Sequence, residues 1–395
     1  MSAPYLRVIS GPGGTHVLFA AQVEHWPFDR MAQHPWPASG SDQQGDLQAQ
    51  WFGHQLRFIG ALHPGLTFDH EHCAEVFTVD LRYLYRPDAK QIDCVLVGKV
   101  FDPDEAKGKQ AAQALFEKLM ALVPIGYALQ PASSDAEFSD WTGEDLAQKQ
   151  DDPHLQWAEI RRPAEFLLWT ARNVPARHLP VVYPFAWNSS GWEGIWMAQF
   201  RLGRPSLISV SLCPTEFPLA EESILANLAA DFYAVAAEAH SPLSPHAPPE
   251  LASAAGSPLA LQAAEFAALY TDYLSALRQP FSMRVSVLGP RPLWLAVRSA
   301  LSGPAWPPDQ VKFHLAVAAE IVEPGEAHLQ TVRENFERLE QTPWNPYPAV
   351  GMPPAPLLER LRYLTGVEGA LCAFRLPLLS ADGLPGVKVG AEISP

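Results

Sequence analysis

The sequence predicts an α+β fold of two α/β-sandwich-like subdomains followed by a C-terminal connector, and three observations lead to this prediction. Of the 395 residues, 48% are hydrophobic and 18% are charged, which is the composition of a packed globular protein. A chain of this length exceeds one ordinary hydrophobic core. Four β-rich runs each lead through a proline into a stretch with helical periodicity, so we expect helices to cover sheets.

The first strand–proline–helix unit comprises a strand at 92–101, Pro103 and a helix at 104–122. Proline suits the first helical turn because its missing N–H has no intrahelical partner there and its φ angle is already helical. Asp102 is expected to cap the N-terminus of this helix. The unit therefore predicts a strand that feeds directly into a helix packed beside it.

The same pattern recurs three more times along the chain. It pairs a strand at 207–212 with a helix at 219–239, a strand at 283–288 with a helix at 291–302, and a strand at 311–322 with a helix at 326–339. A further helix is expected at 259–278. Additional β-rich runs stand in front of the first two units and predict one hairpin over 77–101 and a second over 195–212.

Proline-rich and polar stretches mark the expected linkers between domains. The 39 prolines are about twice the usual share. Linkers are expected around 38–50, 131–153, 241–258 and 342–356. We therefore predict a first domain at 1–150, a second at 151–340 and a proline-rich connector at 341–395.

The charge balance argues against direct binding of nucleic acid. Lys and Arg number 28 against 43 Asp and Glu, which gives a formal net charge of −15. Because duplex binding gains affinity when Lys and Arg release counterions, an acidic chain is expected to need a local basic patch or a partner for any contact with DNA. The expected contacts are with a protein partner or with further copies of the chain.

The cysteines and the hydropathy pattern predict a cytoplasmic protein. The four cysteines are scattered and form no CxxC pair, which suits a reducing compartment. The N-terminal residues show no cationic stretch followed by an apolar run, and no apolar run reaches the roughly 18 residues of a membrane-spanning helix. Neither secretion nor a membrane span is expected.

Motif searches find no complete catalytic or nucleotide-binding signature. The glycine-rich run at 11–15 lacks the lysine of a phosphate-binding P-loop and is expected to be a turn between strands at 6–10 and 17–23. Neither the G-x-S-x-G elbow of α/β-hydrolases nor the H-E-x-x-H motif of zinc proteases is present. No catalytic residue and no cofactor is predicted.

One dense group of potential metal ligands precedes the strand at 76–85. It consists of His63, His70, His72 and Cys73. Because alternate residues of a strand face the same side, His70 and His72 are able to share a metal ion. A polar loop ahead of the strand explains the group equally well, since no second ligand pair stands at a recognisable spacing.

Three tryptophans around the predicted second hairpin form a candidate interaction surface. They are Trp187, Trp192 and Trp196. Tryptophan combines a large apolar contact area with a polar N–H group, which suits a binding surface. The alternative is that these rings pack the hairpin and the core.

The C-terminal part of the chain resembles a known family. The segment Ala-Phe-Arg-Leu-Pro at 373–377 and the segment Gly-Leu-Pro-Gly-Val at 383–387 are similar to the stretch that precedes the ATPase core in bacterial HerA-like ATPases, which are related to conjugative DNA pumps. Further runs that resemble regions ahead of this core lie at 81–87, 95–102 and 279–287. The phosphate-binding motif of the motor is expected after these segments, and the chain does not contain it.

These observations favour a non-catalytic assembly or scaffold module associated with a HerA-like DNA-translocating ATPase. The resemblance implies a role in oligomerisation or in effector recruitment, with conjugation, secretion and anti-phage defence all open. Two alternatives remain. One is a metal-dependent enzyme or binding protein that uses the group around His63, and the other is a protein-binding module centred on the tryptophans.

Overall fold

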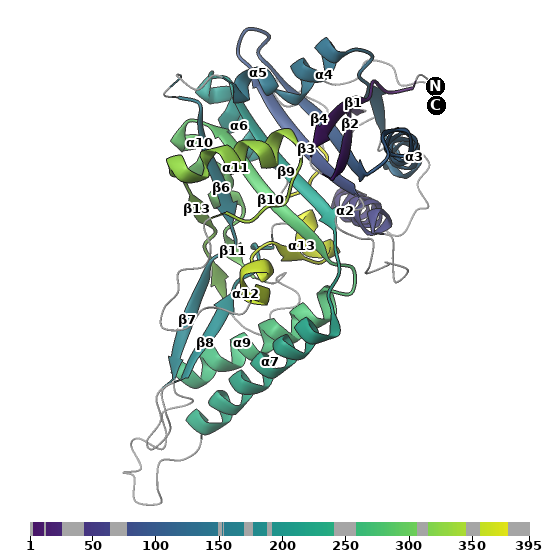
Figure 1. Cartoon of the computed structure of the whole chain (residues 1–395). Helices are drawn as coiled ribbons and strands as arrows, with labels where there is room; N and C mark the ends of the chain where they lie inside the picture. Colours follow the sequence, from purple (N-terminus) through teal and green to yellow (C-terminus); the bar gives the residue numbers. More distant parts are fainter. Residues whose placement is uncertain are drawn as a thin grey trace, which may run out of the picture.

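The computed structural model shows a broad sheet covered by helices and a narrower part that projects from it (Figure 1). We call the sheet with its covering helices the body, and the projecting part the arm. The described residues are 3–11, 13–25, 43–63, 77–148, 152, 154–169, 177–187, 192–240, 258–305, 315–344 and 356–377.

Ten strands of the described chain form one sheet in which every pairing is antiparallel. Two of them extend it locally, since β5 (Tyr127–Pro131) pairs with β2 and β14 (Leu364–Thr365) pairs with β10. The other eight follow one another in the order β1 (Arg7–Gly11), β2 (Gly14–His25), β4 (Gln91–Asp102), β3 (Phe77–Arg86), β9 (Ser206–Pro214), β10 (Phe281–Gly289), β6 (Gln156–Arg161) and β13 (Glu320–Val322).

Strand β3 joins the two halves of this sheet. It pairs with β4, its hairpin partner, and from Val79 to Tyr85 it also pairs with β9. Both β3 and β9 are buried on both faces, which is typical of central strands covered on each side. The sheet therefore continues across residue 150, where the sequence predicts a domain boundary, and the two predicted domains share it.

Helices cover both faces because alternate residues of a strand point to opposite sides. On β2, Val17 and Phe19 belong to the core of one face, whereas Leu18 and Ala20 belong to a core on the other. The first face carries α2 (Gln43–Leu62), α3 (Glu105–Leu122), α6 (Glu193–Leu202), α10 (Arg291–Ala300) and α13 (Val367–Leu371). The second face carries α4 (Asp135–Thr142), α5 (Glu144–Ala147) and α11 (Glu326–Glu337).

The arm has an apolar core of its own. In it Phe232 packs edge-on against Phe266 at 5.4 Å, and Tyr270 donates a 2.8 Å hydrogen bond to the backbone oxygen of Pro180. These contacts hold a helix pair against a β-hairpin (Figure 1). The elements of the arm are β7 (Ala164–Trp169), β8 (Arg177–Val182), α7 (Leu219–His240) and α9 (Pro258–Ala276). Short elements near its base are β11 (Gly303–Pro304), β12 (Ala316–Val317) and α12 (Pro356–Leu361).

The α+β class and most of the predicted elements are confirmed. The hairpin predicted over 77–101 is β3–β4. The glycine-rich run at 11–15 forms the connection between β1 and β2, with Gly11 opposite Gly14. The predicted helices are α3, α7, α9, α10 and α11, and their ends lie within two residues of the predicted ones.

The first strand of the hairpin predicted over 195–212 is wrong, because residues 195–202 belong to helix α6. Ile195, Trp196 and Gln199 recur at helical spacing and are buried, and Gly203 ends the helix with a left-handed φ of 61°. A short apolar run fits a strand and a buried helix equally well. The hairpin predicted over 195–212 is therefore absent, and β9 pairs with β3 and β10 instead.

Two smaller predictions also need correction. The cap of α3 is Asp104, whose carboxylate accepts a 2.8 Å hydrogen bond from the N–H of Ala106. Asp102 instead accepts a hydrogen bond from the N–H of Asp104, so it supports the cap from outside the helix. The strand predicted at 311–322 is, in its described part, the two short strands β12 and β13.

A pair of glycine substitutions tests the packing of the sheet. A Cβ atom at Gly98 would lie 2.1 Å from the fully buried ring of Phe19, so we expect Gly98→Ala to lower the free energy of unfolding by about 1–3 kcal/mol. Gly53 in α2 has open space around it, and Gly53→Ala should raise that free energy by up to about 1 kcal/mol. Urea denaturation measures both variants, and equal effects would contradict the close β2–β4 contact.

Candidate functional site

His63 follows α2 and is engaged in structural contacts. Its side chain is buried, its Nε2 atom lies 3.3 Å from the backbone oxygen of Thr215, and burial lowers its pKa. Within the described ranges, no three His, Cys, Asp or Glu side chains gather where they would hold a metal ion. The metal site that the sequence offers as an alternative stays a hypothesis, because the other three candidates lie outside the described residues: His70, His72 and Cys73.

The interaction surface predicted at the tryptophans needs correction, because two of the three rings lie in the core. Trp192 and Trp196 are 1% and 2% exposed, and their rings pack against Tyr83 at 5.6 and 5.4 Å. Trp192 also donates a 3.2 Å hydrogen bond to the backbone oxygen of Cys372. These rings are therefore inaccessible to a partner. Trp187 is only partly buried and lines a cavity near the arm.

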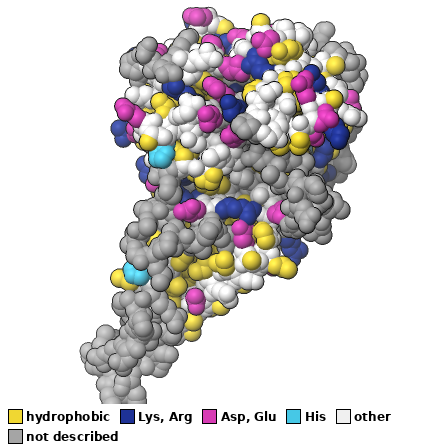
Figure 2. All heavy atoms as spheres, in the orientation of Figure 1, with side chains coloured by type: hydrophobic (Ala, Val, Ile, Leu, Met, Phe, Trp, Pro, Cys, Tyr) yellow, Lys and Arg dark blue, Asp and Glu magenta, His cyan; other side chains and the backbone are white. Residues whose placement is uncertain are grey.

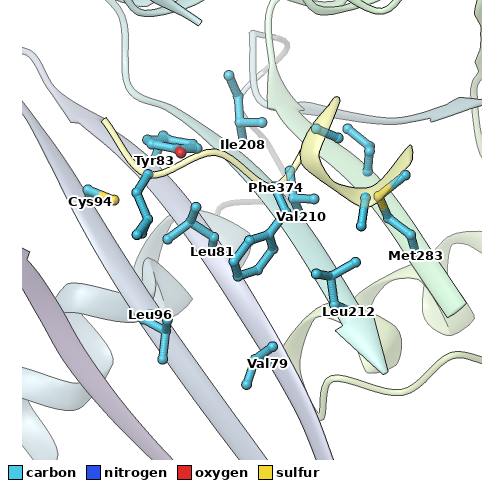
Figure 3. Close-up of a cluster of buried hydrophobic side chains, with 14 of the residues drawn as sticks. Val79, Leu81, Tyr83, Cys94, Leu96, Ile208, Val210, Leu212, Met283 and Phe374 are labelled. Atoms are coloured by element: carbon cyan, nitrogen blue, oxygen red, sulfur yellow. The ribbon is translucent and has the colours of Figure 1, made fainter. Parts of the chain in front are cut away.

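The segment 372–377 crosses the sheet and is held by side chains from several elements (Figure 3). Gln55 on α2 exchanges two hydrogen bonds of 3.1 Å with the backbone of Leu376. The hydroxyl groups of Tyr83 on β3 and Tyr127 on β5 donate to the backbone oxygens on either side of Leu376. This part of the predicted C-terminal connector is therefore an anchored component of the core.

The buried carboxylate of Glu159 forms ion pairs and a hydrogen bond with neighbouring side chains. Glu159 on β6 is 2% exposed, pairs with Arg161 and Arg284, and accepts a 2.8 Å hydrogen bond from Nε1 of Trp344. Burial raises the pKa of Glu159, but the two arginines lower it further, so the net pKa lies below its ordinary value. The carboxylate stays ionised and acts as a structural partner rather than as a general base.

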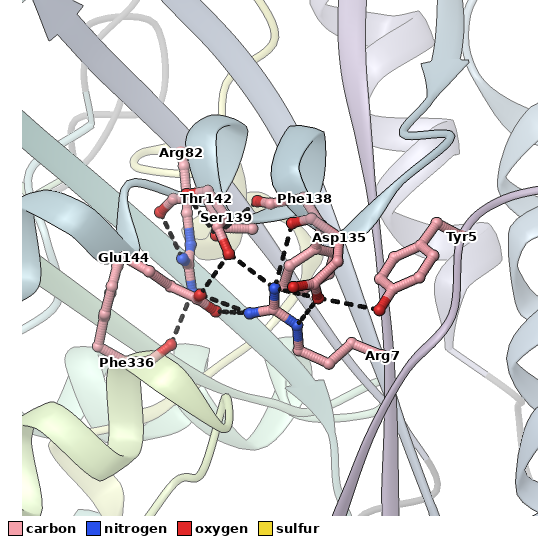
Figure 4. Close-up of polar contacts among 9 residues, drawn as sticks. All are labelled: Tyr5, Arg7, Arg82, Asp135, Phe138, Ser139, Thr142, Glu144 and Phe336. Atoms are coloured by element: carbon pink, nitrogen blue, oxygen red, sulfur yellow. Dashed lines mark hydrogen bonds and ion pairs between the residues drawn. The ribbon is translucent and has the colours of Figure 1, made fainter.

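Two arginines connect the sheet to the helices on its second face (Figure 4). Arg82 on β3 donates hydrogen bonds of 2.7 and 2.6 Å to the backbone oxygens of Thr142 and Phe336. Arg7 on β1 pairs with Asp135 on α4 at 2.6 Å. Guanidinium groups satisfy several acceptors in a fixed geometry, so these contacts hold the layers together. Both guanidinium groups therefore have a structural role.

A cavity of about 510 Å³ lies where the arm meets the body. Its walls come from the end of α9, the connection between β14 and α13, and the segment that follows β8. This volume is sufficient for a small ligand or for side chains of a peptide. Its lining mixes aromatic, small and oppositely charged residues, among them Trp187, Tyr273, Arg278, Gly366 and Glu368.

Large hydrophobic side chains are exposed on the arm (Figure 2). In the described chain, six such side chains are about half exposed or more, and four of them belong to the arm. The exposed fractions in the arm are 52% for Leu168, 79% for Leu219, 53% for Tyr233 and 55% for Leu261. A gathering of exposed apolar groups is typical of a protein-binding surface.

The exposed apolar surface of the arm is not among the features predicted from the sequence, although the pattern of apolar residues in α7 indicates it. One apolar stripe of this helix faces the core of the arm and includes Leu225 and Phe232. Apolar residues also recur on the opposite side of the same helix, at Leu219, Ala226 and Tyr233. An ordinary amphipathic helix carries charged and polar residues on its solvent side, so these apolar residues are the signal for an exposed apolar surface.

No protein-family model matches the chain, and no curated protein matches it. None of the described helices combines the length and the apolar character needed to cross a membrane.

Stability at mildly acidic pH tests the burial of His25 at the end of β2. The ring is 1% exposed and stacks on Tyr127 at 6.2 Å, and burial lowers the pKa of His25 to about 4. The unfolded chain, with a histidine pKa of about 6.5, binds this proton first as the pH falls. Stability is therefore unaffected above pH 6.5 and decreases between pH 6.5 and 4, by about 2 kcal/mol at pH 5.

We expect His25→Phe to remove this part of the pH dependence. Urea denaturation at pH 7.5 and pH 5 measures it, and His178→Asn on the exposed side of β8 is the control. The same loss of stability in wild type and His25→Phe would show that another group causes it.

Proposed function

We propose that this chain is a non-catalytic assembly or scaffold module associated with a HerA-like DNA-translocating ATPase, and that the arm makes its contact with a protein partner. The observation that carries the proposal is the exposure of Leu219 and Tyr233 on a helix pair that projects from the body (Figure 1). Burial of apolar surface contributes about 25 cal/mol per Å², so covering these groups favours association. A projecting element is also accessible to a large partner.

The use of polar groups in the body supports the same proposal. Arg82, Glu159 and Arg284 are nearly inaccessible to solvent, and each is bonded to neighbouring parts of the protein. Buried groups that form such hydrogen bonds and ion pairs stabilise one arrangement of the layers and are not accessible to a substrate. The body is therefore suited to carry the arm in a fixed orientation.

The anchored segment supports association with a translocase in particular. It contains the sequence at 373–377 that resembles the stretch ahead of a HerA-like motor. Its hydrogen bonds to Gln55, Tyr83 and Tyr127 tie it to the sheet. Because packed interiors transmit strain, a load applied at residue 377 would pass into the sheet. This attachment suits a scaffold that works beside a motor.

Co-expression with a HerA-type ATPase from the same organism tests this function. We expect the two proteins to co-elute in size-exclusion chromatography and the isolated chain to hydrolyse no ATP. Leu219→Glu combined with Tyr233→Glu should weaken the complex about tenfold or more, because it places two charges in the interface.

The control variant is Leu295→Glu, which changes an exposed hydrophobic residue of α10 in the body. It should leave the complex intact, and the melting temperature of each variant reports on folding. ATP turnover by the purified chain, or a complex that is indifferent to the arm substitutions, would overturn the proposal.

A further inference from the structure

The solvent-facing side of α7 carries apolar residues among a few polar ones, whereas the opposite side packs against the described part of the arm. Leu225, Phe232 and Val235 lie in the arm core and are at most 1% exposed. We call the solvent-facing side the outer face of α7, and its exposed residues are Leu219, Ala220, Glu222, Ser223, Ala226, Asn227, Ala230, Tyr233, Ala234 and Ala237. Seven of these ten residues are apolar, whereas the solvent-facing side of an ordinary amphipathic helix is mainly charged and polar.

The outer face has the shape that another helix requires. Leu219 and Tyr233 stand as large side chains with the small residues Ala226 and Ala230 between them. Ridges of side chains four residues apart pack into the grooves of a neighbouring helix, and small residues allow a close approach. The 22 residues of α7 span about 33 Å, which is enough for several turns of contact.

Charge identifies the kind of helix that fits. The sequences of α7 and α9 contain six acidic residues and no Lys or Arg. With a rotation of about 100° per residue, Glu222 lies at one border of the outer face and Asp231 at the other. A partner helix with Lys or Arg at both borders of its apolar stripe would pair with these carboxylates.

The same charges argue against the other occupants. A second copy of the chain would bring its own Glu222 and Asp231 to this contact, and like charges placed together weaken association. Nucleic acid and anionic lipid surfaces are repelled for the same reason, and the net charge of −15 strengthens this effect. A basic protein helix is the occupant that fits both the apolar face and its acidic borders.

We propose that the outer face of α7 docks a partner protein through an amphipathic helix whose apolar stripe is bordered by Lys or Arg. This inference rests on the proposed assembly function and specifies the chemistry of the partner. The contact combines burial of Leu219 and Tyr233 with charge pairing at Glu222 and Asp231. The apolar part supplies affinity and the charged borders supply selectivity.

The test uses the full chain and two labelled helical peptides of about 21 residues, matched to the length of α7. Both peptides carry the same Leu and Ala stripe, and one has Lys at the border positions where the other has Glu. Fluorescence anisotropy at about 150 mM salt limits long-range attraction. We expect the Lys peptide to bind about tenfold or more tightly than the Glu peptide.

Charge reversal makes the test specific to α7. The variant Glu222→Lys with Asp231→Lys should invert the preference between the two peptides. A control variant, Glu323→Lys with Glu326→Lys, makes the same change of net charge at two exposed residues of the body, one of them in the first turn of α11. It should leave the preference for the Lys peptide intact. Circular dichroism confirms that the helices are formed in each variant.

Three results would overturn the inference. The first is an equal loss of Lys-peptide binding in both reversed variants, which would assign the binding to overall charge. The second is no loss in either variant. The third is a wild-type dimer, seen by sedimentation and dissociated by Tyr233→Glu, because the outer face would then bind a second copy.

Failure of this inference is distinguishable from failure of the proposed function. If the HerA-type ATPase binds wild type and the Glu222→Lys, Asp231→Lys variant equally, the assembly function stands and the basic helix is wrong. If the ATPase binds neither but the Lys peptide binds as expected, the outer face of α7 is confirmed as a docking surface and the translocase is the wrong partner.

Discussion

The antiparallel ladder between β3 and β9 is the contact on which the rest of the structure depends. It joins strands that are more than a hundred residues apart in the chain, from Val79 opposite Leu212 to Tyr85 opposite Ser206. The hydroxyl of Ser209 donates to the carboxylate of Asp80 across this ladder at 2.8 Å, so even its buried polar groups are paired. The core on the first face includes residues from both halves of the sheet and exists only because the ladder brings them together.

The layers on both faces follow from this continuous sheet. Because β3 and β9 are buried on both sides, each needs helices above and below it. Arg82 extends from β3 to the backbone at Thr142 and Phe336, which fixes the second layer in place. The segment 372–377 is bound on the first face by residues of α2, β3 and β5. A rigid body with an anchored segment results.

The arm differs from the body in what it leaves exposed. The body pairs its buried charges internally, whereas the arm presents Leu219, Tyr233 and Leu261 to solvent. Exposed apolar groups on a projecting element lower the cost of association and raise the risk of non-specific contact. Acidic residues along α7 and α9 reduce that risk, because they repel negatively charged surfaces and are costly to bury where no positive charge pairs with them.

Elements that depend only on neighbours in the chain could be predicted from the amino-acid sequence. The β3–β4 hairpin, the turn between β1 and β2, and the helices α3, α7, α9, α10 and α11 follow from alternation, helical periodicity and turn residues, which act over a few residues. These local signals do not distinguish a helix from a strand at α6, since Ile195 and Trp196 suit both. Three features could not be predicted in this way: the order of the strands, the burial of Trp192 and the exposure of the outer face of α7. The reason is that these features depend on which distant segments bury one another, and burial is a property of the assembled layers rather than of any single segment.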